Sequence, residues 1–233
     1  MTPAGLTVSR RRGLSLLRLE RPPTGLLGSD CWDDLTRELL AAETRQEPVV
    51  LLGLGHDAPP PAEELLDPEQ LEEGARRLHE LLALMTSLGE PVLAAARGHL
   101  TGASCSLALA AHACLLASDA SLAPCDAAGR PAVGLARRLA GRLGQGECLD
   151  VLRRDRPLSA EACVDFGLAQ RVVPADELEE AAEHWHAELV ARGPEWRRLV
   201  LRCTGEAVEL GPDEAAFLEA SLLGLLPQPA EPR

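Results

Sequence analysis

The sequence contains no lysine, isoleucine, asparagine or tyrosine, and aromatic residues make up 2% of its 233 positions. All 23 basic residues are arginine. The missing residues have AT-rich codons, so this bias indicates a GC-rich genome, which we expect to be bacterial. The abundance of arginine therefore says little about phosphate recognition. The net charge of −13 argues against a nucleic-acid-binding protein, because such proteins draw most of their affinity from cations that face phosphates.

Cysteine pairs with metal-binding or redox spacing are also missing. The seven cysteines are scattered without a CxxC motif, and most lie among apolar neighbours. We therefore expect reduced, buried thiols in a cytoplasmic protein, and no metal site. Residues 93–117 come closest to the roughly 20 uninterrupted apolar residues of a membrane span, but they contain Arg97, His99 and His112. The N-terminus lacks the continuous apolar region of a signal peptide. We predict a soluble protein with no membrane partner.

The alternation of apolar strands and amphipathic helices, followed by helices alone, predicts an α/β fold with a helical C-terminal part. The predicted strands are residues 6–8 and 14–19 (a hairpin), 48–55, 91–98, 114–118, 120–124 and 168–174. The predicted helices are one capped by Ser29-Asp30, then 68–88, 102–113, 132–143, 146–153, 158–167 with a serine N-cap, and most of 176–225. We divide the chain into a core, residues 1–174, and a C-terminal helical region, residues 175–233.

Two glycine-bounded segments, residues 53–65 and 98–106, each connect a predicted buried strand to a helix. Backbone N–H groups are unpaired at a helix start, and the helix dipole favours negative charge there. Two such connections side by side can aim two N–H donors at one developing oxyanion, an arrangement that supplies several kcal/mol. Small residues at 102–104 would let a carbonyl group come close to the backbone. Close packing between helix and strand is the alternative interpretation.

The segment PVLAAARGHLTGASCSLALAAHACLLASDASLAPCDAAG, residues 91–129, resembles the crotonase (enoyl-CoA hydratase/isomerase) family. The likeness continues through RLAGRLGQGECLDVLRRDRPLSAEACVDFGLAQRVVPADELEEAA and covers about residues 48–190 in continuous register. Its most specific part is the motif over residues 158–174. The resemblance implies a crotonase-like spiral of ββα units with a C-terminal helical oligomerisation part. It also implies trimers or dimers of trimers, and a substrate that is an acyl-CoA or acyl-carrier-protein thioester. No cofactor is expected beyond the CoA or phosphopantetheine of the substrate itself.

The resemblance also assigns an oxyanion hole to two backbone N–H groups. The first donor maps onto Ala62, within Pro60-Pro61-Ala62-Glu63, where prolines replace residues that would carry an N–H. The second donor is the middle residue of the family's glycine triplet, which is Ala103 here, preceded by Gly102. Alanine is a mild departure, because only the N–H is needed. We expect both donors to polarise the thioester carbonyl.

The acid–base groups depart further from the family pattern. Hydratases of the family use two glutamates that hold water and shuttle its proton, and these positions map onto Ser106 and Asp126. Ser106 cannot act as a general base at neutral pH without a partner, so Asp126 is the single candidate catalytic acid or base. His56 and His99 lie in the two connecting segments. With Gly102 and Ser106, we take them as candidate substrate-binding residues.

Two functions from different classes follow. The first is an enzyme that stabilises an enolate of an acyl thioester, acting as an isomerase or as a decarboxylase- or dehydratase-like lyase, in polyketide or other secondary metabolism. The second is a catalytically silent crotonase-fold partner of another enzyme. The loss of one glutamate and the prolines at 59–61 favour the second. Arg137 and Arg138 could meet CoA phosphates or simply be exposed.

Overall fold

The computed structural model describes residues 5–23, 31–58, 68–125, 129–154, 156–206 and 211–224. Within these ranges two sheets are present, a larger one in the order β1-β2-β3-β4-β6-β9 and a smaller one in the order β5-β7-β8. The larger sheet consists of Leu6–Arg11 (β1), Leu14–Leu19 (β2), Val49–Leu52 (β3), Val92–Ala96 (β4), Ala113–Ala117 (β6) and Arg171–Val173 (β9). The smaller sheet consists of His99–Thr101 (β5), Ser121–Ala123 (β7) and Leu158–Ser159 (β8).

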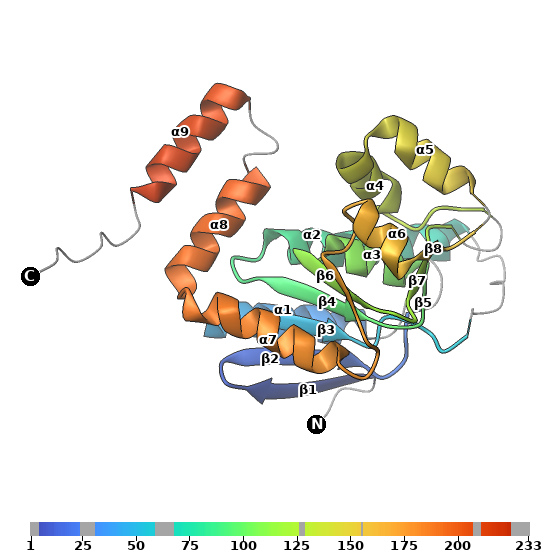
Figure 1. The fold of residues 1–233 in the computed structure, drawn as a ribbon, viewed down its shortest axis with the longest axis horizontal. Coiled ribbons are helices and arrows are strands. Elements are labelled where there is room, and N and C mark those ends of the chain that lie inside the picture. The colour runs from blue at the N-terminus through green and yellow to red at the C-terminus, as the bar shows by residue number, and fades with distance from the viewer. Residues whose placement is uncertain are drawn as a thin grey trace, which may run out of the picture.

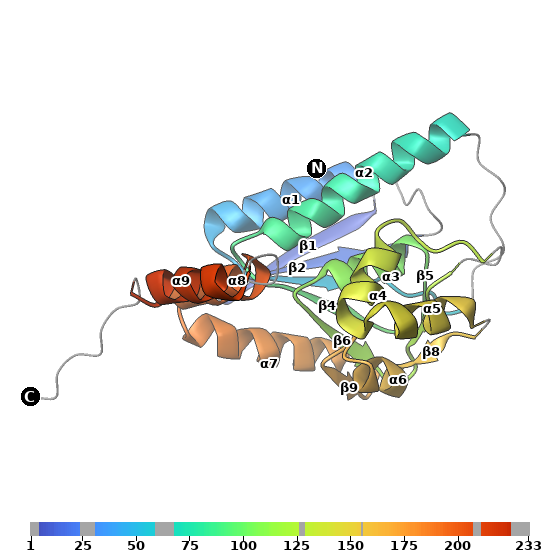
Figure 2. The ribbon, with the colours of Figure 1, turned by 90° about the horizontal axis from the view of Figure 1, so that it is seen from above.

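The helices pack on both faces of the larger sheet and around the smaller one. They are Trp32–Arg45 (α1), Pro68–Ser87 (α2), Ala103–Ala110 (α3), Leu135–Leu143 (α4), Gln145–Arg153 (α5), Ala160–Asp165 (α6), Leu178–Ala191 (α7), Pro194–Glu206 (α8) and Pro212–Leu223 (α9). Helices α1 and α2 lie on one side of the larger sheet and α7 on the other (Figure 2). Helices α8 and α9 extend away from the rest of the molecule (Figure 1).

The predicted hairpin is confirmed, with β1 longer than expected. Strands β1 and β2 are antiparallel, and the register pairs Leu6 with Leu19 and Arg11 with Leu14. The turn residues Arg12 and Gly13 both have positive φ, 52° and 76°. A two-residue turn of this kind matches the right-handed twist of the strands that it joins.

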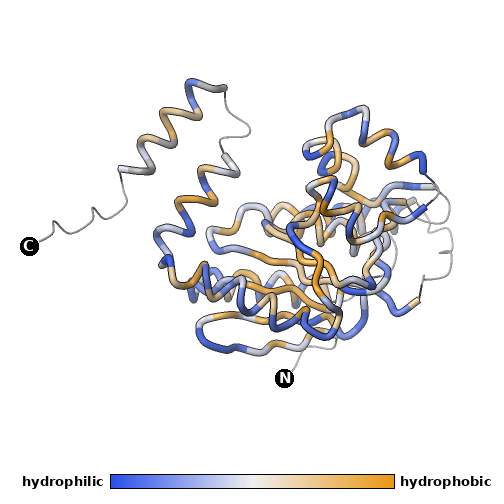
Figure 3. Tube along the Cα trace, viewed as in Figure 1, coloured by the Kyte–Doolittle hydropathy of each residue, from blue (hydrophilic) through white to orange (hydrophobic). Residues whose placement is uncertain are grey.

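In the larger sheet, β2, β3, β4, β6 and β9 pair in parallel, each with its neighbour, and both faces of the sheet are covered. Alternate side chains of β3 therefore enter different cores: Leu51 packs in the cluster that includes α1, α2 and α3, whereas Val50 packs with α7. Such strands have no polar face, which explains the continuous apolar runs in the sequence. These runs form the hydrophobic centre of the molecule in Figure 3. Within the described ranges, every helix is too short or too polar to cross a lipid bilayer.

Several element boundaries differ from prediction by a few residues. The helix predicted over 102–113 ends at Ala110, because the N–H of His112 donates to the carbonyl of Val92 and β6 begins at Ala113. Helix α1 begins at Trp32 with Cys31 as its N-cap; the expected cap, Ser29-Asp30, lies outside the described residues. The helix predicted over 132–143 begins at Leu135.

The segment 98–106, predicted as a single connecting loop, contains the three-residue strand β5. Its partner β7 lies 22 residues further along the chain, with His99 paired to Ser121. Because β5 depends on a partner so far along the chain, no local pattern in the sequence predicts it. The serine N-cap predicted near residue 158 is confirmed, because Ser159 Oγ accepts a hydrogen bond of 3.2 Å from the N–H of Ala162.

Candidate functional site

The ends of β3 and β4 lead into two connections that lie side by side. His56 and His99 exchange two backbone hydrogen bonds: the N–H of His56 donates to the carbonyl of His99 at 2.9 Å, and the reverse bond is 2.8 Å long. This bridge joins the start of segment 53–65 to segment 98–106. The start of α3 is therefore held next to the segment that leads toward residue 62.

Glycines make this close approach possible. A Cβ atom at Gly55 would lie 1.8 Å from the carbonyl oxygen of Arg97, and one at Gly98 would lie 2.3 Å from that of His56. Gly98 also has a φ of 70°, which residues other than glycine rarely adopt. At both positions any side chain would collide with the backbone of the other connection, so glycine is required for steric reasons.

Helix α3 begins at Ala103, with Gly102 as its N-cap at φ 52° and ψ −126°. As the first helical residue, Ala103 has no acceptor for its N–H within the helix, and the helix dipole points its positive end toward this position. Ala103 has no exposed surface, and every residue of α3 is buried. Ala62, the other expected donor, lies outside the described residues.

Ser106 is placed one turn into α3, and its hydroxyl has a structural partner. Ser106 Oγ donates to the carbonyl of Val133 at 2.7 Å, and the residue is fully buried. Ser104 Oγ similarly donates to the carbonyl of Pro23 at 3.0 Å. The Ser106 hydroxyl therefore holds the segment around Val133 against α3.

Asp126, the candidate catalytic carboxylate, lies outside the described residues, but the segments on both sides of it are in place. Cys125 forms an isolated antiparallel bridge with Pro131, and the N–H of Ala132 donates to the carbonyl of Pro124 at 3.4 Å. Together with the bond from Ser106 to Val133, these contacts anchor both flanks of Asp126 near α3.

The two histidines that the sequence singled out have different surroundings. His99 Nδ1 lies 2.8 Å from Ser121 Oγ, so its ring is held by the smaller sheet. His56 Nε2 is buried and has no hydrogen-bond partner among the described residues. The backbones of His56 and His99 are adjacent, and only His56 lines the cavity described below.

The buried thiols are unsuited to nucleophilic attack. Cys105 lies in the first turn of α3, and its Sγ contacts the carbonyls of Leu100 and Ala123, each at 3.2 Å. Burial disfavours the thiolate and raises the pKa of Cys105 well above its ordinary value. No group of three or more His, Cys, Asp or Glu side chains is arranged to hold a metal ion in the part of the chain that the structure describes.

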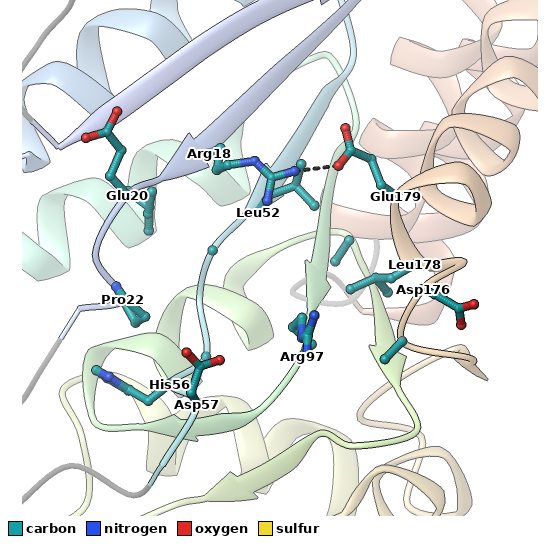
Figure 4. Close-up of a pocket in the computed structure, with 15 residues that line it drawn as sticks. Arg18, Glu20, Pro22, Leu52, His56, Asp57, Arg97, Asp176, Leu178 and Glu179 are labelled. Carbon is teal, nitrogen blue, oxygen red and sulfur yellow. Dashed lines mark hydrogen bonds and ion pairs between the residues drawn. The ribbon is translucent and has the colours of Figure 1, made fainter.

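A cavity of about 600 Å³ opens at the carboxyl ends of β2, β3 and β4, next to the start of α7 (Figure 4). Its floor includes Leu52, Ala95 and Leu178. Its charged lining residues are Arg18, Glu20, Asp57, Arg97, Asp176 and Glu179, and Arg18 forms an ion pair with Glu179. Sequence reasoning missed these residues. The signal available was the position of Arg18 and Arg97 at strand carboxyl ends, where open α/β sheets commonly bind ligands.

Comparison with known proteins identifies the family to which this chain is similar. Residues 9–224 match the family model described as Enoyl-CoA hydratase/isomerase. A crotonyl-CoA hydratase from Syntrophomonas wolfei is 26% identical over 63% of this chain and 57% of its own length. The putative enoyl-CoA hydratase/isomerase YngF from Bacillus subtilis is 28% identical over 55% of this chain and 50% of its own length. The chain thus aligns with about half the length of these curated relatives.

The fold matches solved structures over nearly its whole length. An enoyl-CoA hydratase from Bacillus anthracis superposes with a TM-score of 0.85, at 22% identity, over 94% of this chain and 90% of that one. DspI from Pseudomonas aeruginosa superposes with a TM-score of 0.84, at 21% identity, over 96% of this chain and 89% of that one. The expected crotonase-like fold is confirmed, and the chain belongs to the enoyl-CoA hydratase/isomerase family.

Proposed function

We propose that the protein is an acyl-thioester enzyme that moves a proton through an enolate and does not add water. The observation that carries this proposal is the bond from Ser106 Oγ to the carbonyl of Val133. A buried hydroxyl that donates to a backbone carbonyl cannot accept a proton from water at neutral pH. Hydration by the family's two-carboxylate arrangement would therefore lack one of its two bases, whereas proton transfer needs only one.

In the proposed reaction Asp126 removes a proton from the α-carbon of a 3-enoyl thioester. The electron pair of the broken C–H bond moves toward the carbonyl oxygen, which the N–H groups of Ala62 and Ala103 stabilise. Asp126 then returns the proton to the γ-carbon, the double bond shifts, and a 2-enoyl thioester results. Decarboxylation of a malonyl-type thioester would use the same two N–H groups, with carbon dioxide in place of the proton as the group that leaves the α-carbon.

The surrounding residues have positioning roles in this proposal. Gly102 allows the backbone turn that presents the N–H of Ala103, and the bridge between His56 and His99 sets the spacing between the two connections. Ser106 holds the segment that follows Asp126. The acyl carrier is CoA or an acyl-carrier protein, and a place in polyketide or other secondary metabolism is part of the proposal.

Isotope exchange tests the proposal directly. The protein is incubated in D₂O with crotonyl-CoA and, separately, with a 3-enoyl-CoA, and the thioesters are examined by NMR and mass spectrometry. We expect deuterium at the α- or γ-carbon, no 3-hydroxyacyl product, and loss of exchange in Asp126→Ala. Formation of a 3-hydroxyacyl thioester at a rate comparable with exchange would refute the proposal.

One observation favours a second function, that of a catalytically silent partner protein. Ala103 has no exposed surface, and it does not line the cavity of about 600 Å³ that the described residues form. A backbone N–H can stabilise an oxyanion only where the substrate oxygen comes within hydrogen-bond distance of it. Absence of deuterium exchange with every thioester tried, in protein that is folded by circular dichroism, would favour this second function.

We also propose that the protein assembles as a homotrimer or hexamer through its C-terminal helices, in the cytoplasm. Phe217 on α9 is 76% exposed, and an assembly through this helix would bury it. All seven cysteines are among the described residues and none forms a disulfide, as expected in a reducing compartment. Light scattering after gel filtration should give a trimer or hexamer for the protein and a smaller species for Phe217→Asp.

A further inference from the structure

Two neighbouring strands of the smaller sheet, β5 and β7, each end shortly before a candidate catalytic group. Strand β5 ends at Thr101, just before Ala103, and β7 ends at Ala123, just before Asp126. The two strands pair in parallel, with Thr101 opposite Ala123. Both chain segments therefore leave the sheet at the same edge. The register of β5 against β7 sets the relative position from which each segment continues toward the site.

His99 lies at the start of this register and is held from both sides. Its backbone exchanges hydrogen bonds of 2.8 and 2.9 Å with that of His56, on the segment that leads toward residue 62. In β7 its register partner is Ser121, whose N–H donates to the carbonyl of Gly98 at 2.9 Å. One residue thus joins the starts of the three chain segments that carry the two expected N–H donors and the candidate carboxylate.

The His99 ring adds a side-chain bond between two of these segments. His99 Nδ1 and Ser121 Oγ share a hydrogen bond of 2.8 Å, because paired residues of neighbouring strands project to the same face of a sheet. On the opposite face, Leu100 and Leu122 are buried in the core. The ring and the hydroxyl therefore join β5 to β7 on the half-buried face, where the core does not hold them.

Other side chains near this bond are poorly placed to replace it. Arg97 forms an ion pair with Asp119 at 3.2 Å between the same two segments, but these side chains are 60% and 42% exposed. Exposed ion pairs contribute little, because water and salt screen them. His56 Nε2 has no hydrogen-bond partner among the described residues. The part-buried bond between His99 and Ser121 is therefore the better shielded of the two side-chain contacts.

We propose that His99 is a positioning residue of the proton-transfer reaction. Through Ser121 it fixes the register of β5 against β7, and this register sets the distance between the N–H of Ala103 and the carboxylate of Asp126. The inference rests on the function proposed above. The Nδ1 atom is already engaged by Ser121, which favours this role over the substrate contact that the sequence suggested. A displacement of about 1 Å between reacting groups can lower a rate about 10²-fold.

Deuterium exchange with a 3-enoyl-CoA in D₂O, measured as kcat and KM on the full chain, tests this role. In Ser121→Ala and in His99→Leu we expect kcat to fall by about tenfold or more, with KM within about twofold of the parent protein, because the groups that bind the thioester remain. His99→Asn places an amide near the position of Nδ1 and should restore kcat to within about threefold of the parent protein. The double variant should match His99→Leu within about twofold, because the two side chains act as one unit.

Two control variants separate positioning from general destabilisation. Asp119→Asn weakens the exposed contact between the same two segments. Ser159→Ala removes the N-cap hydroxyl of α6 from β8, the strand next to β7. Both controls should keep kcat within about twofold of the parent protein, even though Ser159→Ala lowers the urea midpoint.

The outcomes distinguish this inference from the proposed function. Absence of exchange in the parent protein with every thioester tried would refute the proposed function, and this role with it. Exchange in the parent protein that is unchanged in both Ser121→Ala and His99→Leu, each folded by circular dichroism, would overturn the positioning role alone. A raised KM at constant kcat in His99→Leu would also overturn it, because that result assigns the ring to substrate binding. Equal loss of kcat in His99→Asn and His99→Leu would overturn it as well.

Discussion

One buried imidazole, His186, and one half-buried imidazole, His112, make the stability of this protein depend steeply on acidity. His186 Nε2 lies 2.8 Å from the carbonyl of Val49. Because a carbonyl only accepts hydrogen bonds, Nε2 carries the hydrogen, and the buried Nδ1 is unprotonated and has no hydrogen-bond partner among the described residues. His112 Nδ1 accepts from the N–H of Val92 at 3.0 Å. A second proton would leave His186 with a buried, unpaired charge near Arg197 and would break the bond that His112 accepts. Burial lowers the pKa of both residues from 6.5 to about 4.

The expected loss of stability follows from these values. Above pH 6.5 both imidazoles are neutral in the folded and unfolded protein, and the full stability is present. As the pH falls from 6.5 to about 4, only the unfolded chain gains the protons, so the free energy of unfolding drops by about 3 kcal/mol for each imidazole at about 1.4 kcal/mol per pKa unit. The raised pKa of buried Glu90 acts in the opposite direction and offsets part of the drop.

Urea unfolding at about pH 7 and about pH 4.5 checks this expectation. In His186→Gln, whose amide can still donate to Val49, the difference between the two pH values should shrink by about 2 kcal/mol. His184→Gln is the control, because His184 is on the same helix with a side chain 72% exposed. The reasoning is wrong if His186→Gln retains the pH dependence of the parent protein.

Two further predictions concern the candidate site. Gly55→Ala should lower the free energy of unfolding by at least about 2 kcal/mol in a urea titration, because its Cβ would lie 1.8 Å from the carbonyl oxygen of Arg97; Gly141→Ala, in open space on α4, should be neutral or stabilising. Ser106→Ala should cost about 1–3 kcal/mol by leaving the carbonyl of Val133 unpaired. An unchanged urea midpoint in either variant would contradict the contact assigned to it.

The hydrophobic pattern of the sequence predicted most of the larger sheet, and its glycines marked the two connections. Strands buried on both faces give long apolar runs, and glycines mark the points where backbone meets backbone, as at Gly55 and Gly98. These are local signals. They singled out the segments at 53–65 and 98–106, and the bridge between His56 and His99 joins the described parts of the two.

The features that the sequence could not reveal depend on pairing at long range. Strand β5 exists only through its pairing with β7. The bond from Ser106 to Val133 spans 27 residues, and the ion pair from Glu90 to Arg197 spans 107. No periodicity or spacing encodes such contacts, because each needs the tertiary fold before its two partners meet.

The central claim is that the backbone N–H of Ala103 stabilises a developing oxyanion. Ala103→Pro removes that N–H, and proline is well tolerated at the first position of a helix. Ala103→Gly keeps the N–H and serves as the control. With a 3-enoyl-CoA in D₂O, exchange should fall about 10²- to 10³-fold in Ala103→Pro and stay within about tenfold in Ala103→Gly. Equal exchange rates in the two variants, both folded by circular dichroism, would contradict the claim.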